Sequence, residues 1–224
     1  MRLVIVSDIH DHVWNLQAAL HWLQVDEEGR RTDGVICCGD YCSPFVPRLI
    51  ARALADRPVP VVLVWGNNDG DTSRMAMTAQ HRPFVRIHDE LAELIVIGGR
   101  LLTRSEHEEQ AGNYSDASNG RRIAVNHFDA IGMPLAASGR YELVCFGHNH
   151  RYEQRRFGHT VALNPGTLMG WSPLADGEVK DVPATFAIVD SEADDWRCRF
   201  YEVAQPWRSP SDPGRVIPFE MPPV

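Results

Sequence analysis

The sequence predicts an α/β protein that begins as strand, helix, strand, helix, strand. Three continuous apolar runs carry this prediction, at residues 2–7, about 34–38 and 61–65. A run without polar alternation is typical of a strand that is buried on both faces. Short connections between alternating strands and helices indicate a parallel sheet with right-handed crossovers.

Two helices are expected between these strands. The segment 13–25 carries four apolar side chains on one helical stripe, Val13, Leu16, Leu20 and Leu23. This spacing is typical of an amphipathic helix that packs on a sheet. The second helix is expected to start at Ser43-Pro44, where a capping hydroxyl precedes a proline, and to run to about residue 57.

The second half of the chain reads as shorter strands. A meander is expected over 84–104, with strands at 84–87, 91–97 and 101–103. Strands at 122–126 and 142–146 follow, separated by a short helical or irregular stretch at 129–138. Two hairpins complete the set, 152–157 with 160–163 and 184–189 with 196–203, and the segment between them, 168–183, is expected to be a loop.

Two segments lack the pattern of a packed element. The stretch 105–121 is polar and turn-rich, and we expect a mobile loop there, either a lid or a tolerated insertion. The stretch 204–224 is proline-rich, and we expect a tail that lies along the surface or frays. Residues 1–203 are therefore expected to form a single domain, a size that suits one substantial core.

Composition and charge exclude several classes of protein. The formal net charge of -8 argues against a broad nucleic-acid-binding or anionic-membrane-binding surface. A phosphate substrate stays compatible with this charge, since bound divalent cations invert the local charge of a carboxylate-lined site. No apolar run approaches the roughly 20 residues of a membrane span. The N-terminus also lacks a signal-peptide pattern, so a cytoplasmic location is expected.

The five cysteines are an odd number, and most of them lie in apolar runs. This usage indicates reduced, buried thiols rather than a disulfide framework. Cys42 is the exception because it lies in a loop two residues after Asp40. It is interpreted as a bystander, with a reactive or metal-proximal thiol as the alternative. Oligomeric state stays open, and a homo-oligomer is compatible with the sequence.

Five apolar strands are each followed directly by a side chain that can bind a metal ion. In chain order these side chains are Asp8, His10, Asp40, Asn67, His127, His148 and His150. Ligand sites in open α/β sheets lie outside the carboxyl ends of the strands, so these residues are expected to converge. Carboxylate, imidazole and amide together suit borderline divalent ions rather than a thiolate zinc site or an all-oxygen calcium site. Seven ligands are too many for one ion and suit two ions that share a bridging carboxylate.

The order and spacing of these motifs resembles the calcineurin-like metallophosphoesterase superfamily, especially its compact bacterial and archaeal phosphodiesterase branch. The motifs are Asp8-x-His10, Gly39-Asp40, Gly66-Asn67-Asn68-Asp69, His127 and Gly147-His148-x-His150. The resemblance covers roughly residues 1–203. It implies two mixed β-sheets packed as a sandwich and flanked by helices, a four-layer α/β/β/α arrangement with a dimetal centre at the sheet edge.

The resemblance also implies a role for each ligand. One metal would take Asp8, His10 and His150, the other would take Asn67, His127 and His148, and Asp40 would bridge them. We expect two divalent ions, Mn first, with Ni, Fe, Zn or Mg as alternatives. The implied activity is hydrolysis of a small phosphodiester or nucleotide by a hydroxide that bridges the metals. The alternatives are a phosphomonoesterase of the same fold and a non-catalytic scaffold on this fold.

Further residues are expected beside the metals. Asp69 would orient a ligand, with a turn cap as the alternative reading. Asn67, His127 and His12 are expected to contact the phosphate or substrate. So is Asn164, because Asn164-Pro165-Gly166-Thr167 resembles the family's Asn-Pro-Gly-Ser turn, although a plain strand-ending loop is the equal alternative.

Two positions depart from the family pattern. Asn68 stands where many members have a histidine that is assigned to leaving-group protonation. An amide donates a hydrogen bond but no proton, which favours diesters with good leaving groups. Phe128 follows His127 where glycine is common. The remaining histidines are expected to be exposed to solvent: His21, His81, His88, His107 and His159.

Overall fold

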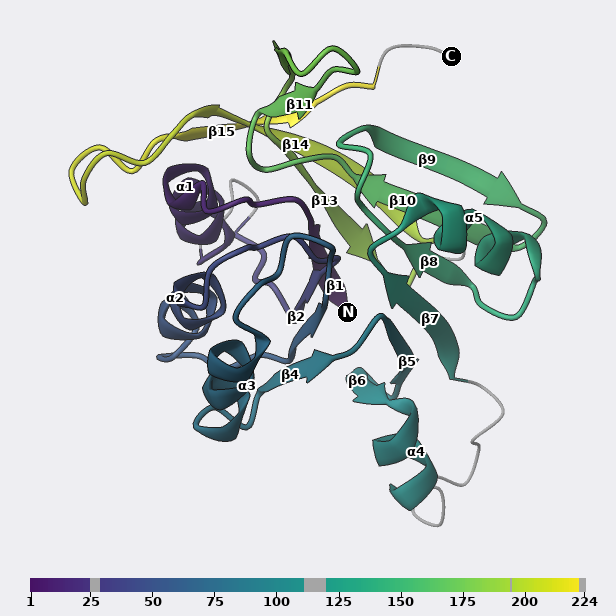
Figure 1. Ribbon diagram of the computed structural model, residues 1–224. Coiled ribbons are helices and arrows are strands. Elements are labelled where there is room, and N and C mark those ends of the chain that lie inside the picture. Colours follow the sequence, from purple (N-terminus) through teal and green to yellow (C-terminus); the bar gives the residue numbers. More distant parts are fainter. Residues whose placement is uncertain (25–28, 111–119, 194, 222–224) are drawn as a thin grey trace.

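The computed structural model describes residues 1–24, 29–110, 120–193 and 195–221. In these parts of the chain the strands form a seven-stranded sheet, a six-stranded sheet and a separate two-stranded hairpin. Figure 1 shows the two large sheets facing each other, with helices on the outside. None of the described helices is long and apolar enough to cross a membrane.

The seven-stranded sheet begins with four parallel strands that are neighbours in chain order. They are β1 (Arg2–Val6), β2 (Gly34–Cys37), β3 (Val61–Val64) and β4 (Val85–His88). Each crossover moves one place in the same direction, so the connecting helices lie on one face of the sheet. These helices are α1 (Val13–Gln24), α2 (Phe45–Ala53) and α3 (Thr72–Gln80), seen together at the left of Figure 1.

The other side of β1 is extended by three antiparallel strands. They are β13 (Thr185–Asp190), β14 (Arg197–Gln205) and β15 (Arg215–Phe219), in that order away from β1. The sheet is therefore mixed, with β1 near its centre. This arrangement leaves the carboxyl ends of the four parallel strands together at one edge.

The six-stranded sheet has the order β6-β5-β7-β8-β10-β9. Its strands are β5 (Leu91–Ile97), β6 (Arg100–Thr103), β7 (Arg121–Asn126), β8 (Leu143–Cys145), β9 (Tyr152–Phe157) and β10 (Thr160–Pro165). Strands β7, β8 and β10 run parallel. Helix α5 (Asp129–Ala137) covers the outer face of these strands.

Alternate side chains of the central strands enter different cores, as β1 shows. Leu3 and Ile5 point into the apolar core between the two sheets, whereas Val4 and Val6 pack against the helices. Every residue of β1 is buried, which explains why its sequence is continuously apolar. A third core lies between the six-stranded sheet and α5. The predicted four-layer α/β/β/α fold is confirmed.

Helix α3 had no counterpart in the elements expected from the sequence. It begins at Asp71, whose side chain accepts a hydrogen bond from the backbone N–H of Arg74 (3.1 Å). Only Met75 and Thr78 are buried along the helix, so it has no apolar stripe. The capping residue Asp71 is therefore the only one of these two features that could indicate the helix from the sequence, because the helix lacks apolar periodicity.

The prediction of a mobile loop at 105–121 is wrong for its first part, where the chain forms α4 (Arg104–Gln110). Thr103 and Glu106 form a capping box, with Glu106 N–H donating to Thr103 Oγ1 (3.2 Å) and Thr103 N–H to Glu106 Oε2 (2.8 Å). Residues 111–119 of the expected loop lie outside the described residues.

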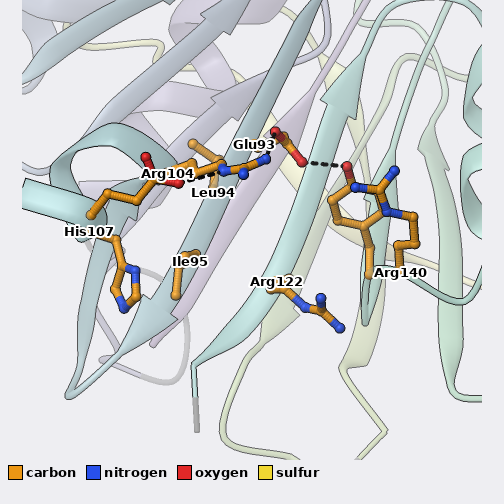
Figure 2. A pocket seen from close by; sticks show the side chains of 9 residues that line it. Glu93, Leu94, Ile95, Arg104, His107, Arg122 and Arg140 are labelled. Atoms are coloured by element: carbon orange, nitrogen blue, oxygen red, sulfur yellow. Dashed lines mark hydrogen bonds and ion pairs between the residues drawn. The ribbon is translucent and has the colours of Figure 1, made fainter. Parts of the chain in front are cut away.

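Ion pairs attach α4 to both large sheets. Arg104 pairs with Glu93 of β5 (3.0 Å), and Figure 2 shows these two side chains side by side. Glu106 pairs with Arg86 of β4 (2.8 Å). The segment makes its tertiary contacts through charged side chains, so its sequence is polar. This polarity led to the prediction of a loop.

The expected loop at 168–183 contains the two-stranded hairpin, which is formed by β11 (Trp171–Pro173) and β12 (Val179–Asp181). Its turn includes Asp176-Gly177, a dipeptide that favours hairpin turns, and Gly177 has a positive φ of 87°. The strands are short and most of their residues are exposed, so they carry no apolar alternation that the sequence could reveal.

The C-terminal stretch, expected to be a surface tail over 204–224, instead supplies the edge strand β15. Val216 of this strand belongs to the core between the sheet and the helices, and Phe219 packs edge-on against Tyr152 with ring centroids 4.7 Å apart. Prolines interrupt the pattern here, and an edge strand tolerates them because one side of it makes no ladder hydrogen bonds.

We predict that Val216→Ala lowers the free energy of unfolding by about 2 kcal/mol, since it removes two buried methyl groups and leaves a void. Val216 is 5% exposed. Val179→Ala is the matched control, because Val179 is 57% exposed and the same truncation there should change the free energy by less than about 0.5 kcal/mol. Urea denaturation measures both. Equal stability of the two variants would show that β15 does not pack on the core.

Candidate metal centre

All seven side chains predicted as metal ligands lie together where β1, β2, β3, β7 and β8 end. In the first group, His10 Nε2 lies 3.8 Å and His150 Nε2 lies 3.4 Å from Asp8 Oδ1. These three residues form one of the clusters whose ligand atoms all lie within 4.8 Å of one another. This group coincides with the set expected for one metal.

The second group consists of Asn67, His127 and His148. Asn67 Oδ1 lies 3.1 Å from His127 Nε2 and 3.0 Å from His148 Nδ1, and the two imidazole nitrogens are 3.2 Å apart. Three potential ligand atoms therefore converge on one small volume. This group coincides with the set expected for the other metal.

Asp40 lies between the two groups. Its Oδ2 is 3.4 Å from Nε2 of His10 and 3.3 Å from Nε2 of His127. One carboxylate oxygen thus contacts an imidazole from each group. This is the position that a bridging ligand would need.

The unpaired atoms of the site fit bound cations. Asp8 Oδ1 and His10 Nε2 are buried, and neither has a hydrogen-bond partner among the described residues. Leaving buried polar atoms unsatisfied is unfavourable unless a ligand completes them. Both atoms face the convergence point of the first group, so a divalent ion there would satisfy them.

Backbone carbonyl groups set the tautomers of two imidazoles. His127 Nδ1 donates to the Cys38 carbonyl oxygen (2.8 Å), and His150 Nδ1 donates to that of Trp171 (3.0 Å). A carbonyl accepts only, so Nδ1 carries a proton and Nε2 is the ring nitrogen that faces the site and is left for a cation. This is the usual support for a metal-binding histidine.

The carboxylates and imidazoles shift one another's pKa values. Burial alone would raise the pKa of Asp8, but contacts with His10 and His150 outweigh it and hold the pKa below its usual range. Burial opposes the charged form of Asp40 as well, and His127 lowers the pKa of that carboxyl. Both carboxylates are therefore ionised at neutral pH and available to cations.

Five of the seven ligand residues adopt left-handed backbone conformations, with φ of 51° at Asp8, 43° at His10, 55° at Asp40, 73° at His148 and 57° at His150. Non-glycine residues rarely adopt this conformation, which costs on the order of 1 kcal/mol each. These conformations let the loops turn sharply at the strand ends, which brings the five side chains back over the edge of the sheet.

Two glycines of the motifs are required by the carboxylates beside them. A Cβ at position 147 would overlap Ser7 Oγ and Asp8 Oδ2, and a Cβ at position 66 would overlap Asp40 Oδ1. Gly66 and Gly147 therefore leave space for the two acids. Their place before Asn67 and His148 follows from this packing.

Asp69 holds the loop that carries Asp40. Its carboxylate accepts backbone N–H groups from Asp40 (3.0 Å), Tyr41 (2.9 Å), Cys42 (2.8 Å) and Gly66 (2.7 Å). Both readings of the residue, orienting a ligand and capping a turn, describe this one arrangement. Asp69 thereby fixes the strand ends of β2 and β3 relative to each other.

Asn68 is directed at Asp40 in this structure. Its backbone N–H donates to Asp40 Oδ1 (2.8 Å) and its side-chain Nδ2 donates to Asp40 Oδ2 (2.8 Å). The amide expected to meet the leaving group thus steadies the central carboxylate.

Asn164 and His12 also serve the scaffold here. Asn164 is fully buried, and its Nδ2 donates to the Gly147 carbonyl and to Asn149 Oδ1 (3.0 Å each), which supports the loop bearing His148 and His150. Its Oδ1 accepts the Gly166 N–H (2.9 Å), so both ends of the amide are engaged within the protein. His12 accepts the backbone N–H of Asn15 at Nδ1 (3.3 Å) and caps α1.

The turn at 164–167 does lie beside the site, as the resemblance implied. The Thr167 hydroxyl donates to the Asp8 carbonyl (2.7 Å). Leu168 donates its backbone N–H to the Ser7 carbonyl (3.2 Å), and the Leu168 carbonyl accepts from Asn15 Nδ2 of α1 (2.7 Å). Gly166 has a φ of 82°, and a Cβ there would overlap Thr185 Oγ1. The turn therefore links the loops that carry Asp8 and His148.

Aromatic and sulfur groups complete the surroundings. Phe128 has an extended backbone (φ -84°) and meets His127 and His148 edge-on at ring distances of 5.1 and 5.0 Å. Cys42 Sγ lies 3.4 Å from His10 Nδ1, and burial raises the pKa of this thiol to about 12. The thiol is thus protonated and lies next to His10, a candidate metal ligand.

The other histidines lie away from the two groups. His21, His81 and His159 are exposed, as expected, but His88 is half-buried in β4 and His107 is buried in α4. The expectation of exposure is wrong for His107, because it assumed a loop where the structure has a helix.

A family model described as the calcineurin-like phosphoesterase superfamily domain matches residues 1–194. The chain belongs to the calcineurin-like phosphoesterase superfamily. The resemblance carried by the motifs is thereby confirmed. Membership makes the chain a metal-dependent phosphoesterase, and the clustered carboxylates and imidazoles are suited to divalent metal ions.

Relatives agree with this assignment. A phosphodiesterase of Methanocaldococcus jannaschii is 24% identical over 197 residues, which is 88% of this chain and 97% of that protein. The solved structure of an archaeal phosphodiesterase has a TM-score of 0.63 at 22% identity and covers 89% of this chain and 98% of its own. Vacuolar protein sorting 29 of Cryptosporidium parvum has a TM-score of 0.55 at 14% identity, with 98% and 97% covered. Both structural likenesses concern the fold.

We predict two metal ions on either side of the Asp40 carboxylate. The physical reason is that Asp40 Oδ2 contacts an imidazole from each ligand group. Crystals grown with Mn²⁺ should show two anomalous peaks, one near Asp8, His10 and His150 and one near Asn67, His127 and His148. A single peak, or an Asp40 side chain turned away from both, would contradict the bridging role.

Proposed function

We propose that the protein is a dimetal phosphodiesterase that hydrolyses a small phosphodiester or nucleotide. The observation that supports it most is the position of Asp40 between two groups of three ligands, with contacts of 3.4 and 3.3 Å to an imidazole of each. Two divalent ions at such a site supply charge neutralisation on the phosphate and an activated water for in-line attack, so a protein nucleophile is unnecessary.

The residues of the chain have separate roles in this proposal. Asp8, His10 and His150 hold one ion, Asn67, His127 and His148 hold the other, and Asp40 holds both. Asp69 keeps the Asp40 loop in place through four backbone hydrogen bonds. The carbonyls of Cys38 and Trp171 keep Nε2 of His127 and His150 directed inward.

Mn²⁺ is the ion that we propose first, and Ni, Fe, Zn or Mg are the alternatives. The ligand set mixes carboxylate, amide and imidazole and includes no thiolate, a chemistry that suits borderline ions. The presence of all seven candidate ligands in contact distance favours an enzyme over a non-catalytic scaffold. Asn68 favours diesters over monoesters, because its amide has no proton to give to a poor leaving group.

To test the function, we would assay aryl phosphodiesters and phosphomonoesters with Mn²⁺, Ni²⁺, Mg²⁺ and Zn²⁺. Asp8→Asn and His148→Ala should each reduce kcat with the diesters by at least about a thousandfold. The first replaces a charged ligand by a neutral amide, the second removes an imidazole, and each 1.36 kcal/mol of lost stabilisation is worth about tenfold in rate. The fold should persist, because the ligands lie at strand ends.

Asp176→Asn and His81→Ala are the matched controls, since both side chains are exposed and lie outside the ligand groups. They should retain wild-type rates. Circular dichroism would verify that all four variants are folded. Near-normal turnover by folded His148→Ala protein would refute the proposed role of the metal centre, and a preference for monoesters would favour the phosphomonoesterase alternative.

A second prediction concerns leaving groups. With no proton donor at position 68, the wild-type rate should depend strongly on leaving-group acidity. Asn68→His should increase the hydrolysis rate of diesters with poor leaving groups relative to those with good ones. The increase should reach up to the roughly 10²–10⁴-fold that general acid catalysis provides. The substitution should also add a titration with a pKa near that of histidine, roughly 6.5. A linear free-energy series of substituted phenyl phosphodiesters measures the slope.

Asn68→Ala is the control for this series. It removes the hydrogen bond to Asp40 without supplying a proton donor, so kcat should fall while the slope stays that of the wild type. Coincident slopes for the wild type and Asn68→His, with no new limb in the pH profile, would show that position 68 takes no part in leaving-group departure.

A further inference from the structure

A cavity of about 510 Å³ adjoins the metal centre and shares one residue with it, His150. Its walls come from the start of β9, from the hairpin β11–β12 and from the segment that follows the hairpin. The volume is in the range of pockets that hold small organic ligands. His150 therefore forms the boundary between this cavity and the metal centre.

The hairpin that walls the cavity also supports the metal centre. The Trp171 carbonyl accepts the Nδ1–H of His150 (3.0 Å), and the two rings lie 6.5 Å apart. The position of the hairpin is thus tied to the position of a metal ligand. A group bound in the cavity would therefore lie at a fixed position relative to the metal centre.

The cavity contains the single lysine of the 224-residue chain, Lys180. Lys180 pairs with Ser172 across the hairpin, and both side chains line the cavity. Arg151 adds a second cationic group. Neither Lys180 nor Arg151 has a side-chain ion pair within the described residues. Asp181 also lines the cavity, so its charged walls carry a net positive charge.

Part of the cavity is apolar. Tyr152, Pro173, Leu174 and Pro183 line it, and Leu174 is 45% exposed. Tyr152 is braced from behind by Phe219. An exposed leucine beside two prolines and a fixed tyrosine offers a surface for a flat or apolar group. The cavity thus combines an apolar surface with unpaired positive charge.

A second cavity, shown in Figure 2, lies away from the metal centre. Arg104 is neutralised there, since it pairs with Glu93 (3.0 Å) and Glu108 (2.8 Å), and Glu93 also accepts the Tyr141 hydroxyl (2.6 Å). Arg122 and Arg140 add positive charge to its walls. That cavity lies on the outer face of the six-stranded sheet, among β5, α4 and the end of α5. It shares no residue with the two ligand groups, so it offers no site for an arm of a substrate held at the metals.

We propose that the cavity beside His150 binds one arm of the substrate, and that this arm carries a second anionic group, a phosphate or carboxylate, on a flat or apolar body. Lys180 and Arg151 would bind the second anion, and Tyr152, Leu174 and the prolines would contact the body. This inference rests on the proposed function and narrows its substrate class. It makes Lys180 and Arg151 specificity-determining residues.

The test compares two diesters that release the same p-nitrophenolate. Thymidine 5′-(p-nitrophenyl phosphate) has one anionic group, and its 3′-phosphorylated analogue has a second one. With Mn²⁺, the wild type should favour the analogue in kcat/KM by about tenfold, the worth of a charge-assisted hydrogen bond. Lys180→Met and Arg151→Met should each lower this ratio mainly through a higher KM for the analogue. Arg82→Met, which changes an exposed arginine that follows α3 and does not line the cavity, should keep the ratio.

The single lysine permits an independent measurement. Only Lys180 and the N-terminal amine can be acetylated as amines in this chain, and the latter is paired with Glu192 (3.1 Å). Thymidine 3′,5′-bisphosphate should slow acetylation of Lys180 in the Mn²⁺-loaded protein and leave the N-terminal rate unchanged, as read by mass spectrometry. Thymidine alone should give no protection.

The outcomes separate this inference from the proposed function. Turnover of neither diester with any of the four metals would overturn the proposed function itself. Turnover of both diesters with equal kcat/KM, or an unchanged ratio in Lys180→Met and Arg151→Met, would overturn the anion-binding arm and leave the phosphodiesterase standing. Absence of protection at Lys180 would likewise overturn the assignment of this lysine.

Discussion

Two carboxylates buried at one edge of the sandwich constrain most of the structure around them. Asp8 is completely buried and Asp40 nearly so, and an ionised carboxylate cannot leave water without compensation. The imidazoles of His10, His127 and His150 provide part of it, and the N–H groups of the loops provide more. The remainder is left to cations. The site is therefore a place where the fold holds unsatisfied negative charge for a ligand.

This constraint explains local features that have no value for folding alone. Left-handed backbones at five ligand residues are unfavourable, and they persist because the surrounding hydrogen bonds fix the loops. Asp69 anchors the loop after β2, Thr167 anchors the loop after β1, and Asn164 anchors the loop after β8. Each anchor is itself buried or half-buried. The hydrogen bonds of these buried side chains thus offset the backbone strain at the candidate ligands.

Much of this site could be predicted because its chemistry leaves a local record in the sequence. Each ligand follows an apolar strand, and the period and order of the strands predict that their carboxyl ends meet. The supporting contacts leave no such record where they use the backbone. The carbonyls of Cys38 and Trp171 orient two imidazoles, and any residue type could supply a carbonyl. Side-chain direction was equally hidden, since nothing in the motif shows that Asn68 points to Asp40 rather than to the substrate.

The same reasoning separates the parts of the fold that were predicted from those that were missed. Long apolar runs such as 61–65 reveal buried strands, whereas α3, α4 and β11–β12 bury little and depend on caps, ion pairs and a turn. Thr103 with Glu106, Asp71, and Asp176-Gly177 are the signals that could have shown them. The C-terminal strand was obscured by its prolines, which an edge position tolerates.

The missed elements are also those that shape the surroundings of the metals. The candidate ligands follow strands whose two faces pack into two different cores, so the packing of the sheets fixes their positions. The hairpin β11–β12 is short, exposed and free to vary in sequence without disturbing a core. Yet it contacts His150 through Trp171 and presents Lys180 to the adjoining cavity, and β15 steadies Tyr152 from behind. In the proposed function, reactivity depends on the residues at the strand ends and selectivity on the hairpin and β15, and only the former are recorded in the motifs.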